Sequence, residues 1–129
     1  MIKIYRTHDE PLALNVNTLK SAKLHRANFH RCLLNNVDAT EADLSKADFR
    51  SAEMKDSVFN NVIFNDAQLI MVKANRSLFD GCVFRGTLLL SSDFSNLIAK
   101  VWKHVVLKMQ FLMISLFGEK ILMLLNLVQ

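Results

Sequence analysis

The chain has 129 residues, of which 51% are hydrophobic, and a formal net charge of +4. This length suits one domain, and the apolar content excludes a generally disordered chain. Two cysteines exclude a disulfide framework, and three glycines with one proline argue against a glycine-rich phosphate loop.

Residues 1–11 are expected to cap the domain at its N-terminal end. Ile2 and Ile4 alternate with polar neighbours, which is typical of a short covering strand. Asp9 and Glu10 stand where a secretion signal would need an apolar run, so we expect a reducing, cytoplasmic location.

Residues 12–99 repeat with a period of five. The segment ATEADLSKADFRSAEM, residues 39–54, shows the unit: an alanine, an acid, then a large apolar residue. In this register every fifth position from Leu14 to Ala99, the central slot, is apolar. The position two residues earlier, the small slot, holds only Ala, Cys, Val, Ser or Thr from Ala22 to Ser92. Neither slot holds a charge, as expected of inward side chains, because burying an unpaired charge is costly.

A chain with two inward positions in five turns a corner every five residues and closes a coil after about 20 residues. An amphipathic helix does not fit, because a period of five spreads apolar residues about 140° apart and forms no stripe. Residues 20 apart should instead stack about 4.8 Å from one another. The outward charges agree with this register, since opposite signs stack at Lys23 and Asp43, Lys46 and Asp66, Asp56 and Arg76, and Glu53, Lys73 and Asp93.

The units ADLSK, ADFRS, ANFHR and AEMKD resemble those of the pentapeptide-repeat family. The resemblance implies an all-β fold over residues 12–99, a right-handed quadrilateral β-helix of about four coils with the central slots stacked inside. The predicted core side chains are therefore Leu24, Phe29, Leu34, Leu44, Phe49, Met54, Phe59, Phe64, Leu69, Phe79, Phe84, Leu89 and Phe94.

Residues 100–129 leave the repeat and are predicted to form a C-terminal α-helical cap. Lys100, His104 and Lys108 follow helical spacing opposite apolar residues, up to about Phe117, and Gly118 is the expected stop. A membrane span is disfavoured because the longest uncharged run is far short of about 20 residues. Membrane-surface contact by a basic amphipathic helix is a second alternative. We favour a cap that also joins two subunits, as the resemblance implies, with a candidate partner interface at Val101, Trp102, Val105, Leu112 and Leu116.

Outward positions of the later coils become apolar, which is typical of a contact surface. They form three groups: Val58, Leu78 and Ile98; Ile63 and Val83; and Ile70, Met71, Leu88 and Leu90. The alternative is that the C-terminal segment folds back over them.

Few residues indicate chemistry. His25-Arg26 and His30-Arg31 are expected to form a solvated basic band, because two imidazoles alone make a poor metal site. Cys32 and Cys82 fall in small slots too far apart for a disulfide, so we expect buried, inert thiols. No catalytic set is recognisable, so the sequence predicts neither an enzyme nor a cofactor.

The resemblance also raises the alternative of a DNA-mimicking protein that binds DNA gyrase or topoisomerase. Net charges of +4, −3, +1 and −1 over residues 17–36, 37–56, 57–76 and 77–96 argue against dense negative charge along a rod. Nucleic-acid binding is likewise not expected, because the aromatic residues face inward and cannot stack on bases. The sequence favours a non-enzymatic protein-binding or scaffold module that forms a homodimer.

Overall fold

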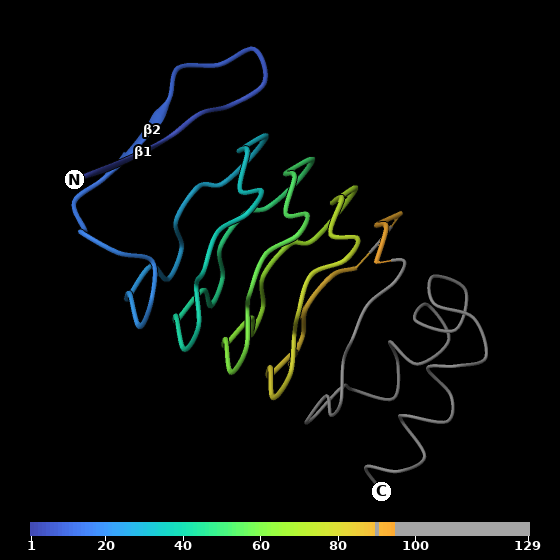
Figure 1. Cartoon of the computed structure of the whole chain (residues 1–129). Helices are drawn as coiled ribbons and strands as arrows, with labels where there is room; N and C mark the ends of the chain where they lie inside the picture. Colours follow the sequence, from blue (N-terminus) through green and yellow to red (C-terminus); the bar gives the residue numbers. More distant parts are fainter. Residues whose placement is uncertain (90, 95–129) are drawn as a thin grey trace, which may run out of the picture.

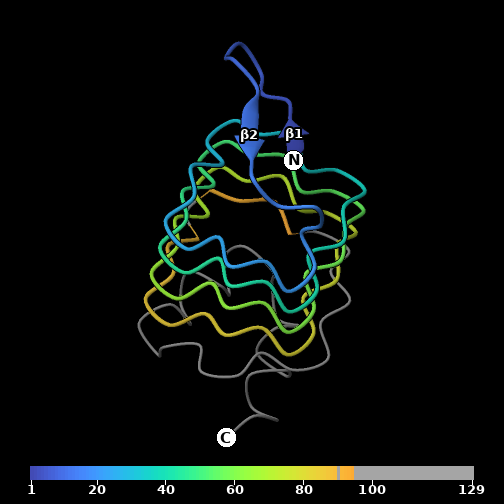
Figure 2. The ribbon, with the colours of Figure 1, turned by 90° about the vertical axis from the view of Figure 1, so that its left-hand side faces the viewer.

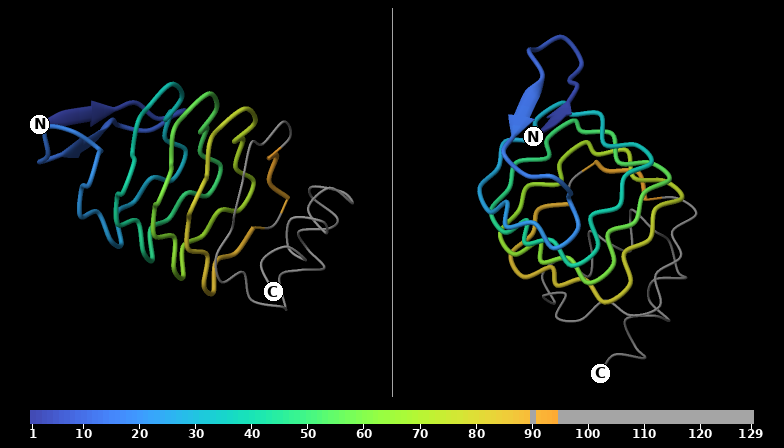
Figure 3. Two further views of the ribbon diagram at one scale, coloured as in Figure 1. Left: turned by 60° about the horizontal axis from the view of Figure 1, so that its bottom comes forward. Right: turned by 60° about the vertical axis from the view of Figure 1, so that its left-hand side comes forward.

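The structure is a computed structural model that describes residues 1–89 and 91–94. Two short strands come first, β1 (Ile2–Ile4) and β2 (Leu12–Leu14), and form an antiparallel hairpin. The chain then winds into stacked coils whose axis runs away from this hairpin (Figure 1). The coils repeat one outline, as the views in Figures 2 and 3 show.

Parallel pairing between residues 20 apart holds the coils together. Lys23 pairs with Asp43, Asp43 with Ile63, and Ile63 with Val83. Along this ladder the Asp43 N–H donates to the Ala22 carbonyl at 2.9 Å, and the Leu24 N–H donates to the Asp43 carbonyl at 2.9 Å. The chain is therefore a β-helical solenoid, and the predicted period and stacking are confirmed.

Four such ladders divide each coil into four walls, which we name by their outward residues. They are wall A with Lys23, Asp43, Ile63 and Val83; wall B with Asn28, Asp48, Gln68 and Leu88; wall C with Leu33, Glu53, Lys73 and Asp93; and wall D with Asp38, Val58 and Leu78.

Tight turns separate the walls. In most of them the N–H of a small-slot residue donates to the carbonyl three residues earlier, as from Ala42 to Ala39 at 3.0 Å. The second residue at the tip has a positive φ, for example 58° at Asn36 and 71° at Gly81. This conformation favours glycine and asparagine. A Cβ at Gly81 would also collide with Oδ1 of Asn61 in the coil before, so a side chain here would require the Asn61 side chain to move.

The interior is formed by the two inward slots. All thirteen predicted core side chains lie inside, and none is more than 9% exposed. Small-slot residues between Ala42 and Ala52 are fully buried at the corners. Small side chains are required there because the chain passes close to the corner backbone of the neighbouring coils.

Phenylalanine rings stack along the axis in the interior. Phe64 and Phe84 lie parallel, with centroids 5.2 Å apart and planes 9° apart, and Phe59 and Phe79 repeat the arrangement at 5.2 Å. Phe49 meets Phe64 edge-on at 5.9 Å. Such contacts add to the free energy gained from burial alone.

The N-terminal hairpin covers part of the first coil's edge. Ile2 pairs with Leu14, so Leu12–Leu14 belongs to the hairpin, and the regular coils begin after the boundary predicted at residue 12. Beyond β1, the Leu33 N–H donates to the Tyr5 carbonyl at 2.8 Å. Arg6 replaces a missing coil on wall B, because its Nη2 donates to the Asn28 carbonyl at 2.7 Å.

The predicted C-terminal helix, cap and dimer segment, residues 100–129, lie outside the described residues. Within residues 1–89 and 91–94, no helix is long and apolar enough to cross a membrane.

Candidate contact surface

The outward residues of the solenoid change character along its axis. On walls A and D the first described coils carry Lys23, Asp38 and Asp43. From residue 58 onward the same columns carry Val58, Ile63, Leu78 and Val83. A side chain on these columns can therefore be acidic or aliphatic without changing the coil.

The acidic residues of the first coils satisfy the turns that follow them. Oδ1 of Asp43 accepts hydrogen bonds from the Ser45 N–H at 3.1 Å and the Ser45 hydroxyl at 2.6 Å. Asp38 makes the same two contacts with Thr40, at 3.0 and 2.6 Å. This bond to the backbone two residues on explains the acid of the five-residue unit, because the turn N–H would otherwise lack a partner.

After Leu78 and Val83, an asparagine of the coil before takes over this role. Oδ1 of Asn60 accepts from the Asp80 N–H at 3.0 Å, and Oδ1 of Asn65 accepts from the Arg85 N–H at 3.1 Å. Each asparagine lies one coil before the turn that it satisfies. Wall D can thus be aliphatic at Leu78 without leaving the Asp80 N–H unsatisfied.

One turn has an apolar tip. Ile70 and Met71 occupy the two tip positions of the turn between walls B and C, and Met71 has a φ of 57°. Among the described residues, Met71 is the one apolar side chain among the non-glycine residues of positive φ. Met71 is 59% exposed, and Leu88 on adjoining wall B is 47% exposed. We call Ile70, Met71 and Leu88 the B–C patch.

Surface charges are neutralised within and between coils. Arg76 binds Asp56 of the coil before through two hydrogen bonds, at 2.6 and 2.8 Å, as the stacking register predicts. Two other acids take nearer partners: Asp48 pairs with Arg50 of its own turn at 2.7 Å, and Asp38 pairs with Lys20 at 3.1 Å. The sequence reasoning missed these pairs because stacking considers only residues 20 apart.

These contacts predict acid sensitivity. Hydrogen bonds from Ser45 hold the pKa of Asp43 below its usual range, Asn35 does the same for Glu53, and Arg76 lowers the pKa of Asp56. A carboxyl with a lowered pKa binds fewer protons in the folded state than in the unfolded state. Its stabilisation is complete above its unfolded pKa of about 4 and disappears as the pH falls through the lowered folded pKa.

We therefore expect the urea midpoint to fall on acidification below about pH 4.5. Asp43→Asn should reduce this dependence, because the amide does not titrate. A midpoint that stays constant or rises from pH 5 to pH 3 would contradict these contacts.

The histidines and cysteines form no recognisable chemical centre. Among residues 1–89 and 91–94, no three His, Cys, Asp or Glu side chains are grouped so that they could hold a metal ion. Cys32 and Cys82 are free and buried, and desolvation by burial raises the pKa of Cys82 to about 12. Cys82 is thus protonated at neutral pH, and its Sγ donates to the Phe59 carbonyl at 2.8 Å.

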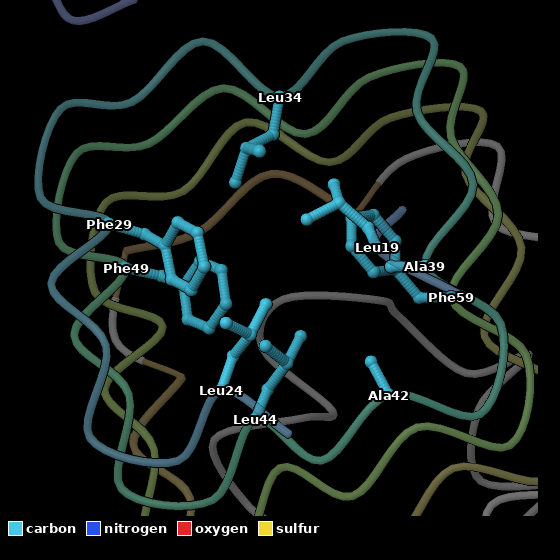
Figure 4. Close-up of a pocket in the computed structure, with 9 residues that line it drawn as sticks. All are labelled: Leu19, Leu24, Phe29, Leu34, Ala39, Ala42, Leu44, Phe49 and Phe59. Atoms are coloured by element: carbon cyan, nitrogen blue, oxygen red, sulfur yellow. The ribbon is translucent and has the colours of Figure 1, made fainter. Parts of the chain in front are cut away.

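The interior contains a small apolar cavity near its N-terminal end, where the central slot holds Ala39 between Leu19 and Phe59 of the neighbouring coils (Figure 4). Its volume is about 10 Å³, about one water molecule at most. Leucine and phenylalanine side chains such as Leu24, Phe29 and Phe49 close around it. It is too small and apolar to be a substrate site.

The candidate interface residues Val101, Trp102, Val105, Leu112 and Leu116 lie outside the described residues. The B–C patch and the aliphatic columns lie within them and form the candidate contact surface. Their apolar character was recognisable in the sequence, whereas the positive φ of Met71 was not, because the period does not report backbone conformation.

Comparison with known proteins agrees with this geometry. A sequence model of the family described as pentapeptide repeats matches residues 22–61 in eight copies. No protein in a search of curated sequences matches the chain.

Similar solved structures include two pentapeptide repeat proteins. One is a pentapeptide repeat protein from the Arabidopsis thaliana thylakoid lumen, with 14% identity over 76% of this chain and 78% of that protein and a TM-score of 0.40. The other is HetL, a pentapeptide repeat protein involved in heterocyst differentiation regulation from the cyanobacterium Nostoc. It shares 19% identity over 66% of this chain and 52% of HetL, with a TM-score of 0.32.

The five-residue turns, the 20-residue ladders and the matched units together identify the class of protein. Residues 22–61 carry pentapeptide repeats, and the described coils have the β-helical fold of such repeats.

Proposed function

We propose that the chain is a protein-binding or scaffold module whose partner contacts the B–C patch. The observation that carries the proposal is the turn Ile70–Met71. Each other described turn tip presents a polar residue or glycine at its second position, where Met71 presents a large apolar one.

Met71 is unfavourable for the isolated chain in two ways. A side chain with a Cβ costs about 1–2 kcal/mol in the left-handed conformation. Its exposure also leaves apolar surface in water, beside that of Leu88. Both costs are offset if a partner covers the patch, since Met adapts to irregular binding surfaces.

Met71→Asn is expected to keep or slightly raise the stability of the chain, because asparagine tolerates the positive φ. The same variant combined with Leu88→Gln should lose partners that the wild type retains in affinity capture from the producing cells. Lys73→Gln on wall C is the matched control. Identical partners for the wild type and the patch variant would contradict the proposal.

The proposal includes a homodimer through the C-terminal segment. Light scattering of the full chain should give twice the monomer mass, and replacing Val105 and Leu112 with serine should give the monomer. A monomeric full chain at micromolar concentration would refute the dimer while leaving the B–C patch open to other partners.

The alternative, a DNA mimic that binds gyrase, has less support. Asp38, Asp48 and Asp56 are each paired with a cation, which interrupts the negative surface that a DNA substitute needs. We expect no effect of the protein at micromolar concentration in a gyrase supercoiling assay. Inhibition or protection of gyrase in that assay would favour the mimic.

A further inference from the structure

The surface charge of the first coils differs from wall to wall. Wall B with its two flanking turns, residues 25–31 and 45–51, holds four Lys or Arg and one acid, a net charge of +3. Wall D is opposite wall B in the order of walls around the coil. Its residues 35–41 and 55–61 hold one Lys and three acids, a net charge of −2. The first two coils thus present a basic wall opposite an acidic one.

Two cations beside wall B have no acidic partner in the described part of the chain. Arg26 and Lys46 are both exposed and stack in successive coils at the corner between walls A and B. The Arg26 N–H donates to the carbonyl of Ser45, the neighbour of Lys46, at 2.8 Å. Among residues 1–89 and 91–94, neither side chain has a carboxylate oxygen within 4.0 Å. Like charges in such a position repel each other, so an anion beside them would be stabilising.

The acid that follows Lys46 in this column leans the other way. Asp66 lies one coil after Lys46, but its Oδ1 occupies the place that a Cβ at Gly86 would need, in the coil after that. Gly86 thus leaves room for the carboxylate on the side away from Lys46. The Lys46 ammonium group is therefore available to a carboxylate from another molecule.

A third cation lies at the other edge of wall B. Arg31, at the corner between walls B and C, reaches the Asp9 carboxylate at 3.8 Å, and the two side chains are 46% and 44% exposed. An exposed ion pair of this kind is weak, so a partner can replace it. We call Arg26, Lys46 and Arg31 the basic end of wall B.

The basic end and the B–C patch share one surface. Arg31 and Met71 occupy the same turn position two coils apart, and two coil spacings are roughly 10 Å. About three residues of an extended segment span this distance, at about 3.3 Å each. A typical interface covers about 800 Å² per partner, which is more than the three partly exposed side chains of the patch offer. A partner that covers Met71 and Leu88 is therefore expected to reach the basic end as well.

We propose that the partner is a protein segment in which acidic residues adjoin apolar ones, and that it lies along wall B with its acids at the basic end. This inference rests on the binding function proposed for the B–C patch. Charge complementarity favours carboxylates at the basic end, while Met71 and Leu88 favour apolar side chains in the same molecule. A nucleic acid offers negative charge without such side chains, and the inward aromatic residues of the chain cannot stack on its bases.

A random library of displayed short peptides, selected on the immobilised full chain at low salt, tests this chemistry. We expect the enriched peptides to carry Asp or Glu beside large apolar residues. The most enriched peptide, synthesised with a fluorescent label, should bind the full chain in solution with an affinity that falls as salt is added. Arg26→Gln with Lys46→Gln should weaken this binding about tenfold at low salt. Lys55→Gln with Lys73→Gln removes the same charge from wall C and its far corner and should leave the affinity nearly unchanged.

Met71→Asn with Leu88→Gln should weaken the same peptide about tenfold or more, because it removes the apolar anchor. Enriched peptides that lack acids but still depend on Met71 and Leu88 would overturn this inference and leave the function proposed for the patch standing. Acidic peptides that bind the patch variant as tightly as the wild type would overturn the shared surface, and so would a library without any enriched peptide. A labelled oligothymidine that binds as tightly as the peptide, with the same loss in the Arg26→Gln, Lys46→Gln chain, would assign the basic end to nucleic acid instead.

Discussion

Replacing Phe64 with alanine is expected to lower the free energy of unfolding by about 3–5 kcal/mol. Phe64 is fully buried and contacts four rings, those of Phe49, Phe59, Phe79 and Phe84. Its removal leaves a cavity in the middle of the column, where the hydrogen-bonded coils above and below prevent collapse. Urea titration followed by circular dichroism measures the loss.

Phe64→Leu and Gln68→Ala are the matched controls for this change. Leucine already fills the equivalent slot at Leu44, one coil earlier, so Phe64→Leu should cost much less than Phe64→Ala. Gln68 lies on the outside of wall B and should have little effect. A loss well under 1 kcal/mol for Phe64→Ala would contradict the interior placement.

Ser57→Ala is expected to lower the free energy of unfolding by about 1–3 kcal/mol. The buried Ser57 hydroxyl donates to the Leu34 carbonyl at 2.8 Å and accepts from the Val37 N–H at 3.1 Å. The hydroxyl thus bridges the Val37 N–H and the Leu34 carbonyl. In most other turns the corresponding N–H donates directly to the corresponding carbonyl. Without the hydroxyl, the part-buried Val37 N–H and the buried Leu34 carbonyl lose their partners.

Ser51→Ala, at a turn tip of a neighbouring corner, is the control for Ser57→Ala. A matching, negligible loss in both variants would show that the turn at residues 34–37 can close on itself as the turn at Ala39–Ala42 does. The hydroxyl would then have no structural role.

The period of five was sufficient to predict which side chains lie inside. It placed Phe49, Phe64 and Phe84 in the interior and Asp56 beside Arg76, because both follow from the direction of successive side chains. The period also predicted that small-slot residues such as Ala42 and Ala47 lie inside.

Hydrogen bonding was not predictable from that period. The sequence has an acid at Asp43 and a serine at Ser57, but the turn N–H or carbonyl that each satisfies depends on the local backbone. The hairpin was likewise only half predicted. Ile2–Ile4 was expected as a strand, whereas its pairing with Leu12–Leu14 was not, because Leu14 also fits the five-residue register.

The sequence predicts the fold better than the function, because the five-residue repeat specifies only the inward positions. Outward residues are free to vary, as shown by the replacement of Asp43 with Ile63 one coil later on wall A. Such substitutions carry the information on partners. The B–C patch stands out because Met71 has both a positive φ and an exposed apolar side chain, neither of which the coil requires of that residue type.

The connection between residues of successive coils is tested most directly by scalar couplings across backbone hydrogen bonds in nuclear magnetic resonance. The structure predicts couplings from the Asp43 amide to the Ala22 carbonyl, the Ile63 amide to the Ala42 carbonyl and the Val83 amide to the Val62 carbonyl. Each pair is separated by 21 residues. Couplings between residues four apart over this region would instead indicate helices and contradict the solenoid.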